Sequence, residues 1–236
     1  MRQRHLFASV LCLAVVAVLF GCSSEGEKEP TAKEMRPLDL IRMTPQFSQA
    51  DLFAFRHPVR SEKNPFVTLE TSKGTMLLEL YHDVAPIHVD SFSARVREGF
   101  YDGLVFHRII DRFMIQSGAF QADGNYRQVP YLLNAEFSEL LHYEGSLGAA
   151  RGQDPNSAST QFFIDLERNN QTEYLDGKYT VFGQLISGYD VLHAIGSVEC
   201  VPRGSEVSLP KENVFLQRAY LCDKNGQPVS GAAAEQ

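Results

Sequence analysis

The segment FHRIIDRFMIQSGAF, residues 106–120, constrains the fold more than any other part of the chain. Its two apolar runs, separated by Asp111 and Arg112, are typical of a hairpin of buried β-strands. Three polar side chains lie within these runs: His107, Arg108 and Gln116. An unpaired guanidinium is costly to bury. Arg108 therefore needs either an internal partner, such as the acid Asp111, or a ligand.

Short strand-like runs follow one another from residue 66 onward. FVTLETSKGTMLLELY gives two runs with a turn at residues 72–74, and NVFLQRAYLC alternates like a closing strand. Two segments have the apolar spacing of helices: residues 85–100, where Pro86 suits the first turn, and residues 188–196. Many short strands with only two helices predict an all-β barrel or sandwich and not alternating βαβ units.

The N-terminal sequence MRQRHLFASVLCLAVVAVLFGCSS predicts export. Two arginines precede an apolar run that is too short for an ordinary membrane span and is typical of a secretory signal. The run ends in LFGC, which resembles the cleavage box of bacterial lipoproteins, with Phe20 where a small residue is usual. We therefore expect residues 1–21 to be removed and Cys22 to carry acyl chains, several of which anchor a protein stably. The alternative is a soluble secreted protein in which Cys22 is incidental.

The lipid on Cys22 would hold the protein in the cell envelope, facing the periplasm or the outside. Ser23 stands where an Asp typically retains lipoproteins at the inner membrane, which favours the outer membrane if two membranes exist. Residues 22–64 are expected to be a flexible tether, because their first part is polar and charged without apolar periodicity. Residues 65–225 would form one folded domain and residues 226–236 a disordered tail.

Composition and motifs argue against several classes of function. The net charge of −7, without any Lys/Arg cluster, argues against nucleic acid as a partner. The sequence holds no Gly-rich phosphate loop, CxxC or HExxH, and His82 with His88 is too loose a pair for a metal site. GSLGA around Ser146 lacks the flanking pattern of a hydrolase nucleophile. We therefore expect no metal and no cofactor.

Two cysteines, Cys200 and Cys222, remain in the expected mature domain. The cell envelope permits disulfides. The two residues therefore either form a bridge or are two separate buried thiols, and the sequence leaves both open.

Three segments carry a family resemblance: FHRIIDRFMIQSG, ARGQDPNSASTQFFIDL and YLDGKYTVFG. They resemble the signature blocks of the cyclophilins, a family of peptidyl-prolyl cis–trans isomerases. The first family block is close to F-H-R-hydrophobic-hydrophobic-P-G-F-M-x-Q-G-G. This chain keeps Phe106, His107, Arg108, Phe113, Met114, Gln116 and Gly118. The resemblance runs from about Phe66 to Cys222 and implies a monomer folded as an eight-stranded antiparallel closed β-barrel capped by two α-helices.

The resemblance also implies roles for individual residues. Arg108 would be the catalytic arginine aimed at the substrate's proline nitrogen, with Gln116 holding it and bonding the substrate backbone, and His107 beside it. The implied substrate-binding residues are Phe113, Met114, Ala150, Phe163, Tyr174, Leu175 and Tyr179. For Phe163 and Leu175 the alternative is plain core packing.

The chemistry of such a site follows from the peptide bond. Rotation about an X–Pro bond faces a barrier of about 18–20 kcal/mol and takes tens to hundreds of seconds unaided. A fixed cationic donor aimed at the prolyl nitrogen stabilises the twisted state more than either planar state. The sequence thus predicts an isomerase that assists the folding of exported, proline-containing polypeptides. The alternative is a chaperone or scaffold that binds the same peptides with little turnover.

Three departures from the family pattern bear on the site. Asp111-Arg112 replaces the Pro-Gly turn, Ser117 replaces a Gly, and Tyr174 stands where a Trp favours cyclosporin binding, so we expect weak inhibition by cyclosporin. A two-residue turn at Asp111-Arg112 would pair Ile110 with Phe113. Strict alternation would then separate Arg108 from Gln116 unless a bulge or twist intervened.

Overall fold

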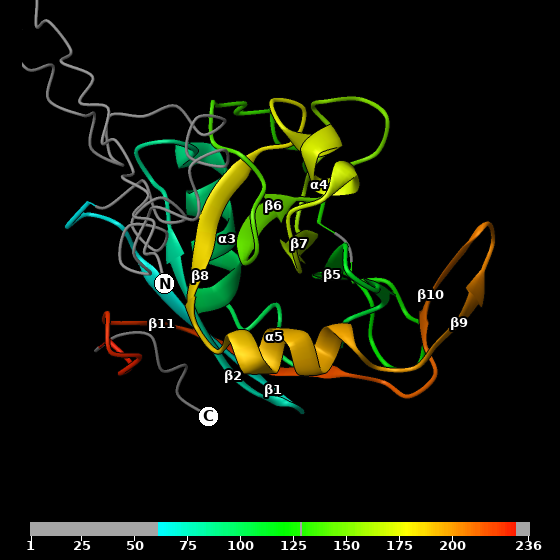
Figure 1. Cartoon of the computed structure of the whole chain (residues 1–236). Coiled ribbons are helices and arrows are strands. Elements are labelled where there is room, and N and C mark those ends of the chain that lie inside the picture. The colour runs from blue at the N-terminus through cyan, green and yellow to red at the C-terminus, as the bar shows by residue number, and fades with distance from the viewer. Residues whose placement is uncertain (1–60, 128, 230–236) are drawn as a thin grey trace, which may run out of the picture.

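The computed structural model describes residues 61–127 and 129–229 (Figure 1). The predicted signal peptide, Cys22, most of the predicted tether and residues 230–236 lie outside this part of the chain. Within it, every helix is too short or too polar to cross a membrane.

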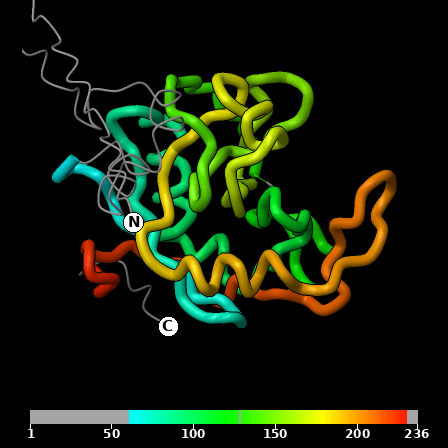
Figure 2. The backbone as a smooth tube through the Cα atoms, viewed as in Figure 1, coloured from blue at the N-terminus to red at the C-terminus, as the bar shows by residue number. Residues whose placement is uncertain are grey.

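Most strands belong to one curled antiparallel sheet. The hydrogen-bonded order is β3-β11-β1-β2-β8-β6-β7-β5-β4. The strands are β1 (Phe66–Thr71), β2 (Gly74–Leu80), β3 (Leu104–Val105), β4 (Arg108–Ile110), β5 (Met114–Ser117), β6 (Ser146–Ala149), β7 (Phe162–Asp165), β8 (Val181–Ser187) and β11 (Phe215–Cys222). A separate hairpin of β9 (Cys200–Arg203) and β10 (Glu206–Pro210) projects from the body of the domain beside β4 and β5, as the tube in Figure 2 shows.

The sheet is open in its hydrogen-bonded order, so the predicted closed barrel of eight strands is not confirmed, while the mainly β architecture is confirmed. Strands β3 and β4 are the two edges, and in the described residues no ladder joins them. Only two residues separate these strands, so they continue one another and cannot lie side by side. The intervening backbone is bonded elsewhere: Phe106 N donates to Val214 O (2.9 Å) and His107 N to Gln116 O (3.1 Å). Register shifts in β1, β2 and β6 increase the curl.

The two predicted helices are confirmed, and a third was not predicted. Helix α3 (Pro86–Arg97) has its proline in the first turn, and its buried side chains include Val89, Phe92 and Val96. Helix α5 (Tyr189–Gly196) buries Val191, Leu192 and Ile195. The additional helix α4 (Asn170–Leu175) has only six residues and begins with a capping box in which the Asn169 side chain accepts from the Thr172 backbone N–H.

The core lies inside the curl of the sheet. Helix α3 packs along β11, and α5 packs against β2 and the β4–β5 hairpin. The ring of Phe92 on α3 lies 5.4 Å from that of Phe162 and 5.5 Å from that of Phe182, both edge-on. Met114, Phe163 and Leu175 form a second, smaller buried cluster apart from this core. That cluster leads to the site described below.

The described chain makes contacts slightly beyond the predicted domain boundaries at both ends. Asn64 is buried and its Nδ2 donates to Glu79 Oε1 (2.8 Å). After β11 the chain turns back: Asp223 N donates to Gln227 O (2.8 Å) and Val229 N to Leu221 O (3.2 Å). Residues 226–229 therefore lie along the sheet, past the boundary predicted at residue 225.

Cys200 and Cys222 are two separate thiols. The Cys200 Sγ lies 3.6 Å from Ile109 O on the side of β4, whereas the Cys222 Sγ accepts from Thr68 Oγ1 (3.2 Å) at the end of β11. The two residues belong to different sheets. The structure therefore shows no bridge between them; Cys222 is a buried thiol, whereas Cys200 is only half-buried.

Candidate active site

The β4–β5 hairpin positions the polar residues of the opening motif. Arg108 pairs with Gln116 and Ile110 with Met114, so the loop has three residues, 111–113, and not two. Phe113 N closes the turn on Ile110 O (3.0 Å). Arg112 adopts φ 58°, a left-handed conformation that usually falls to glycine, which is the residue the family pattern has at this position.

This register removes the difficulty raised by a two-residue turn. Arg108 and Gln116 are directly opposite, and Met114 lies two residues before Gln116 on the same face. All three side chains reach one cavity without a bulge in either strand. The turn is not the two-residue one considered from the sequence, because Phe113 also belongs to the loop and Ile110 pairs with Met114.

His107 directly precedes β4, and its side chain does not line the cavity. Its imidazole is buried against the Phe120 ring, with centroids 4.7 Å apart. Burial, reinforced by the positive charge of Arg203, lowers the pKa of His107 to about 4, so the ring is neutral near pH 7. His107 is therefore not among the residues that line the cavity, and the catalytic role expected for it stays a prediction.

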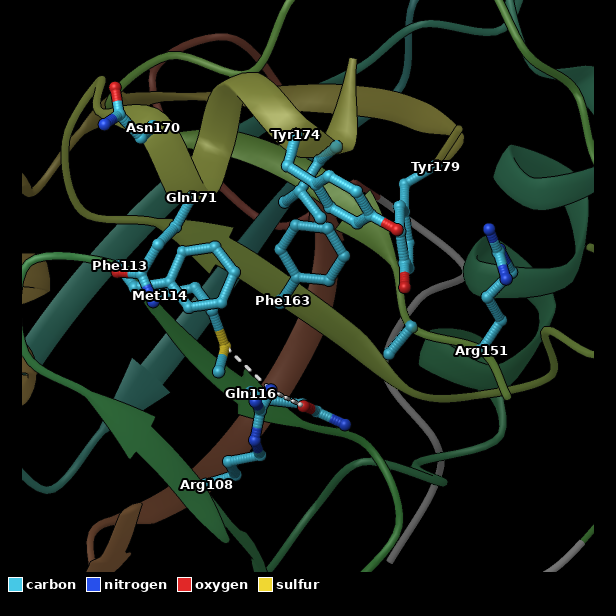
Figure 3. Close-up of a pocket in the computed structure, with 12 residues that line it drawn as sticks. Arg108, Phe113, Met114, Gln116, Arg151, Phe163, Asn170, Gln171, Tyr174 and Tyr179 are labelled. Carbon is cyan, nitrogen blue, oxygen red and sulfur yellow. Dashed lines mark hydrogen bonds between the residues drawn. The ribbon is translucent and has the colours of Figure 1, made fainter. Parts of the chain in front are cut away.

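The cavity has a volume of about 500 Å3. It is lined by all the other residues that were predicted for catalysis or substrate binding (Figure 3). Arg108 and Gln116 lie on one side, with the rings of Phe113, Phe163, Tyr174 and Tyr179 across from them. The lining residues are Arg108, Phe113, Met114, Gln116, Ala150, Arg151, Phe163, Asn170, Gln171, Tyr174, Leu175 and Tyr179.

The floor of the cavity is apolar. Met114, Phe163 and Leu175 are each at least 94% buried and pack on one another, while Phe113 and Tyr179 cover them in part. Phe163 and Leu175 therefore do more than fill the main core, to which neither belongs. An apolar ring of a ligand would lose its hydration here against four or five apolar side chains.

Behind this floor lies a buried polar pair. The His142 ring stacks on Phe163 at 5.6 Å, and its Nδ1 lies 2.8 Å from Asp165 Oδ2. Both side chains are fully buried, and burial raises the pKa of Asp165 to about 6, although His142 opposes that shift. The pair thus supports the outer face of the ring that forms the floor.

A chain of hydrogen bonds orients the polar side of the cavity. Arg108 Nη1 donates to Gln116 Oε1 (3.1 Å) and lies 3.9 Å from Met114 Sδ. Gln116 Nε2 in turn donates to Gln161 Oε1 (2.9 Å). The Gln116 amide thus has its oxygen toward the guanidinium and its nitrogen toward Gln161.

Arg108 also has an acidic partner, but it is not Asp111. Arg108 Nε donates to Glu206 Oε1 (2.7 Å) and Nη2 donates to Glu206 Oε2 (2.8 Å), a bidentate pair with a residue of β10. The hydrogen bonds from Arg108 lower the pKa of Glu206 to about 2, so the carboxylate is ionised near pH 7. Arg108 therefore has an internal acidic partner and still lines the open cavity.

The rim of the cavity includes residues that the sequence did not indicate. The guanidinium of Arg151 stacks over the Tyr179 ring at 4.2 Å, and the ammonium of Lys178 lies 3.8 Å from the Tyr174 ring centre. Asn170 and Gln171 come from α4. The Asn-x-x-Thr capping pattern could have revealed α4, but the sequence around Glu206 carries no such signal.

This arrangement can seat an apolar ring and present a cationic hydrogen-bond donor to its edge. Across residues 61–127 and 129–229, no group of three or more His, Cys, Asp or Glu side chains could hold a metal ion. The chemistry available to the side chains in the cavity is binding and hydrogen-bond donation.

Comparison with known proteins gives consistent matches. Residues 66–219 match the family model described as cyclophilin type peptidyl-prolyl cis-trans isomerase/CLD. The chain is 36% identical over 156 residues to a peptidyl-prolyl cis-trans isomerase of Acinetobacter baylyi, which covers 65% of this chain and 83% of that protein. It is 35% identical over 163 residues to peptidyl-prolyl cis-trans isomerase B of Escherichia coli, covering 66% of this chain and 99% of that protein.

A solved structure matches as well. It is a cyclophilin type peptidyl-prolyl cis-trans isomerase of Cryptosporidium parvum, crystallised in the presence of the dipeptide Ala-Pro. The TM-score is 0.55 at 25% identity, and the match covers 65% of this chain and 96% of the other.

Proposed function

The chain belongs to the cyclophilin-type peptidyl-prolyl cis-trans isomerase family, and from this premise we propose that it accelerates rotation about X–Pro bonds in exported polypeptides and so assists folding in the cell envelope. One observation carries the proposal: Arg108 Nη1 lies at the edge of an apolar cavity and is bonded to Gln116.

In this mechanism the proline ring sits on the apolar floor. Phe113, Met114, Phe163 and Leu175 hold the ring still while the chain before it turns. As the C–N bond twists, the amide loses resonance and the prolyl nitrogen regains a lone pair. A donor of Arg108 that faces this nitrogen binds the twisted form better than either planar form, which is what lowers the barrier.

Gln116 has two tasks in this scheme. Its Oε1 accepts from Arg108 and limits the rotation of the guanidinium. Because Gln116 also lines the cavity, its amide would bond the backbone of a bound peptide. Ala150 and the rim residues Tyr174 and Tyr179 would contact the residues on either side of the proline. No covalent bond breaks, so the reaction needs neither nucleophile nor cofactor.

The decisive experiment is a proline-isomerisation assay on a short X-Pro peptide with the wild-type protein and Arg108→Ala. We expect kcat/KM to fall by several hundredfold or more in the variant, which corresponds to about 3.5 kcal/mol of lost transition-state stabilisation. Arg112→Ala is the matched control, because Arg112 is an exposed arginine on the same hairpin that pairs with Glu167 and not with the cavity. The control should keep its activity within about twofold.

The alternative function, a chaperone or scaffold with little turnover, makes the opposite prediction. Wild type and Arg108→Ala would then bind a proline peptide equally well and accelerate isomerisation equally little. Such a result would reject the role given to Arg108.

The location in the envelope is supported by the signal sequence and the LFGC box at residues 19–22. Cys22 would be the lipidated first residue of a monomeric protein tethered to the outer membrane. Labelling cells with an alkyne analogue of palmitate tests this. Cys22→Ser should abolish the label and release the domain from the membrane fraction, whereas Cys12→Ser, within the signal, should leave both unchanged.

A further inference from the structure

The β9–β10 hairpin reaches the catalytic arginine from outside the cavity. Glu206 binds the edge of the guanidinium formed by Nε and Nη2, at 2.7 and 2.8 Å. Gln116 binds the remaining nitrogen, Nη1, from the cavity side. The guanidinium is thus held between two partners that are 90 residues apart in the chain.

Glu206 is itself fixed in place. Ser208 Oγ, which belongs to a fully buried residue, donates to Glu206 Oε1 at 2.8 Å. The hairpin is secured to β4 and to the residue before it, since Arg203 Nη1 donates to His107 O (3.4 Å) and the Cys200 Sγ approaches Ile109 O. Glu206 and Ser208 face β4, while Val207 and Leu209 are exposed on the other face of the hairpin. The carboxylate therefore has a defined position relative to Arg108.

A long arginine side chain loses much rotamer freedom when its head group is immobilised. If that freedom were lost only as the X–Pro bond twists, the loss would add to the barrier. A bidentate carboxylate removes it in advance, because two parallel hydrogen bonds fix the plane of the guanidinium. Preorganisation of this kind favours the transition state over the ground state.

We propose that Glu206 is a positioning residue for isomerisation, which fixes the Arg108 guanidinium in the plane that presents its free Nη hydrogens to the cavity. The inference rests on the proposed function. It assigns a catalytic contribution to the β9–β10 hairpin, which contributes no residue to the cavity lining.

The same carboxylate could act in the opposite direction by reducing the positive charge that the substrate meets. The two effects differ in sign. Loss of a positioning contact lowers kcat, because the donor is no longer held where the nitrogen will be. Loss of an inhibitory charge raises kcat.

The test compares Glu206→Gln with Glu199→Gln. Glu199 lies at the base of the same hairpin and pairs with the exposed Lys211, so its variant removes the same charge without touching Arg108. We expect kcat of Glu206→Gln to fall about tenfold with KM within about twofold, the pattern of an interaction used in the transition state. Glu199→Gln should stay within about twofold of wild type in both constants. An unchanged or increased kcat in Glu206→Gln would overturn the proposal.

A second measurement does not depend on activity. The Nε–H resonance of Arg108, assigned by its absence from the Arg108→Lys spectrum, should be sharp and slow to exchange in wild type. In Glu206→Gln this resonance should broaden, or its chemical shift should move toward that of a solvent-exposed arginine. In Glu199→Gln the resonance should stay unchanged. If wild type itself proved inactive, the proposed function would fail, while this resonance would still report whether Glu206 holds the guanidinium. A sharp, unshifted resonance in Glu206→Gln would overturn the positioning role.

Discussion

Gly148 of β6 lies directly against the ring of Phe163 on the paired strand β7, so closely that a Cβ at residue 148 would come within 2.7 Å of three ring atoms. The floor of the cavity therefore depends on the absence of a side chain at this position. The Phe163 ring lies between the backbone of Gly148 and the ring of His142.

Gly148→Ala should push Phe163 out of its place in the floor. Overpacking a close-packed site typically costs about 1–3 kcal/mol of stability. We also expect KM for an X-Pro peptide to rise about tenfold, because the seat of the proline is lost while Arg108 is not. Urea unfolding and steady-state kinetics measure the two effects.

A double-mutant cycle separates displacement of the ring from a general loss of stability. Phe163→Leu leaves room for the new methyl group, so the double variant should be more stable than the sum of the single changes by about 1 kcal/mol. Strict additivity would show that Gly148 and Phe163 are not coupled.

The hydrogen-bond chain Arg108–Gln116–Gln161 predicts a graded loss of activity. Gln116→Ala removes the acceptor of Arg108 Nη1 and should lower kcat/KM by about 10- to 100-fold. Gln161→Leu removes the acceptor that orients the Gln116 amide but leaves Arg108 Nη1 its own acceptor, so a loss of about threefold is expected.

Gln217→Ala is the control for this series, because Gln217 is an exposed glutamine on β11 that does not line the cavity. It should stay within about twofold of wild type. A loss in Gln161→Leu as large as that in Gln116→Ala would show that Gln161 contacts the substrate directly.

Most of the residues that line the cavity could be identified from the sequence, because they are concentrated in short local motifs. Arg108, Met114 and Gln116 come from one hairpin, and Phe163 follows from a second motif with the same aromatic character. The sequence could also indicate helices α3 and α5, whose apolar faces repeat with helical spacing.

The errors concern geometry that no local pattern specifies. The hairpin register depended on Arg112 taking a left-handed conformation that the residue itself disfavours. Helix α4 is too short to show a periodic apolar face, and of its side chains only Thr172 and Leu175 are buried. The pairing of Arg108 with Glu206 joins residues 98 positions apart, so only the folded chain reveals it. The closed barrel is not confirmed for a similar reason, because closure depends on how the two edge strands meet.

Inhibition by cyclosporin is expected to be weak, and the structure suggests how to strengthen it. Tyr174 is 63% exposed at the rim, with the Lys178 ammonium over its ring. Tyr174→Trp would enlarge the aromatic surface and add an indole N–H donor. We expect the inhibition constant to fall at least tenfold, or about 1.4 kcal/mol.

The natural chain has no tryptophan, so the indole of Tyr174→Trp would also report binding through its fluorescence. Phe137→Trp places the same fluorophore at another exposed position and serves as the control. A nanomolar inhibition constant for the wild-type protein would contradict the expectation of weak binding.

His107 predicts how stability depends on pH. Burial and the charge of Arg203 lower its pKa from 6.5 to about 4 in the folded protein. Between these two values the unfolded chain binds the proton and the folded protein does not, so stability rises with pH across this range. The contribution is complete above pH 6.5 and is lost as the pH falls toward 4. A shift of this size corresponds to about 3 kcal/mol.

Other groups titrate in the same range, and Asp165 acts in the opposite direction, since its raised pKa of about 6 makes stability fall as the pH rises. The free energy of unfolding should therefore be measured at pH 4, 5, 6 and 7 for wild type and for His107→Gln, because the contribution of Asp165 is common to both. The difference between the two proteins isolates His107: wild type should lose about 3 kcal/mol more than the variant between pH 7 and pH 4. Parallel pH profiles would show that His107 takes up its proton in the folded protein as readily as in the unfolded chain, and would contradict its burial against Phe120.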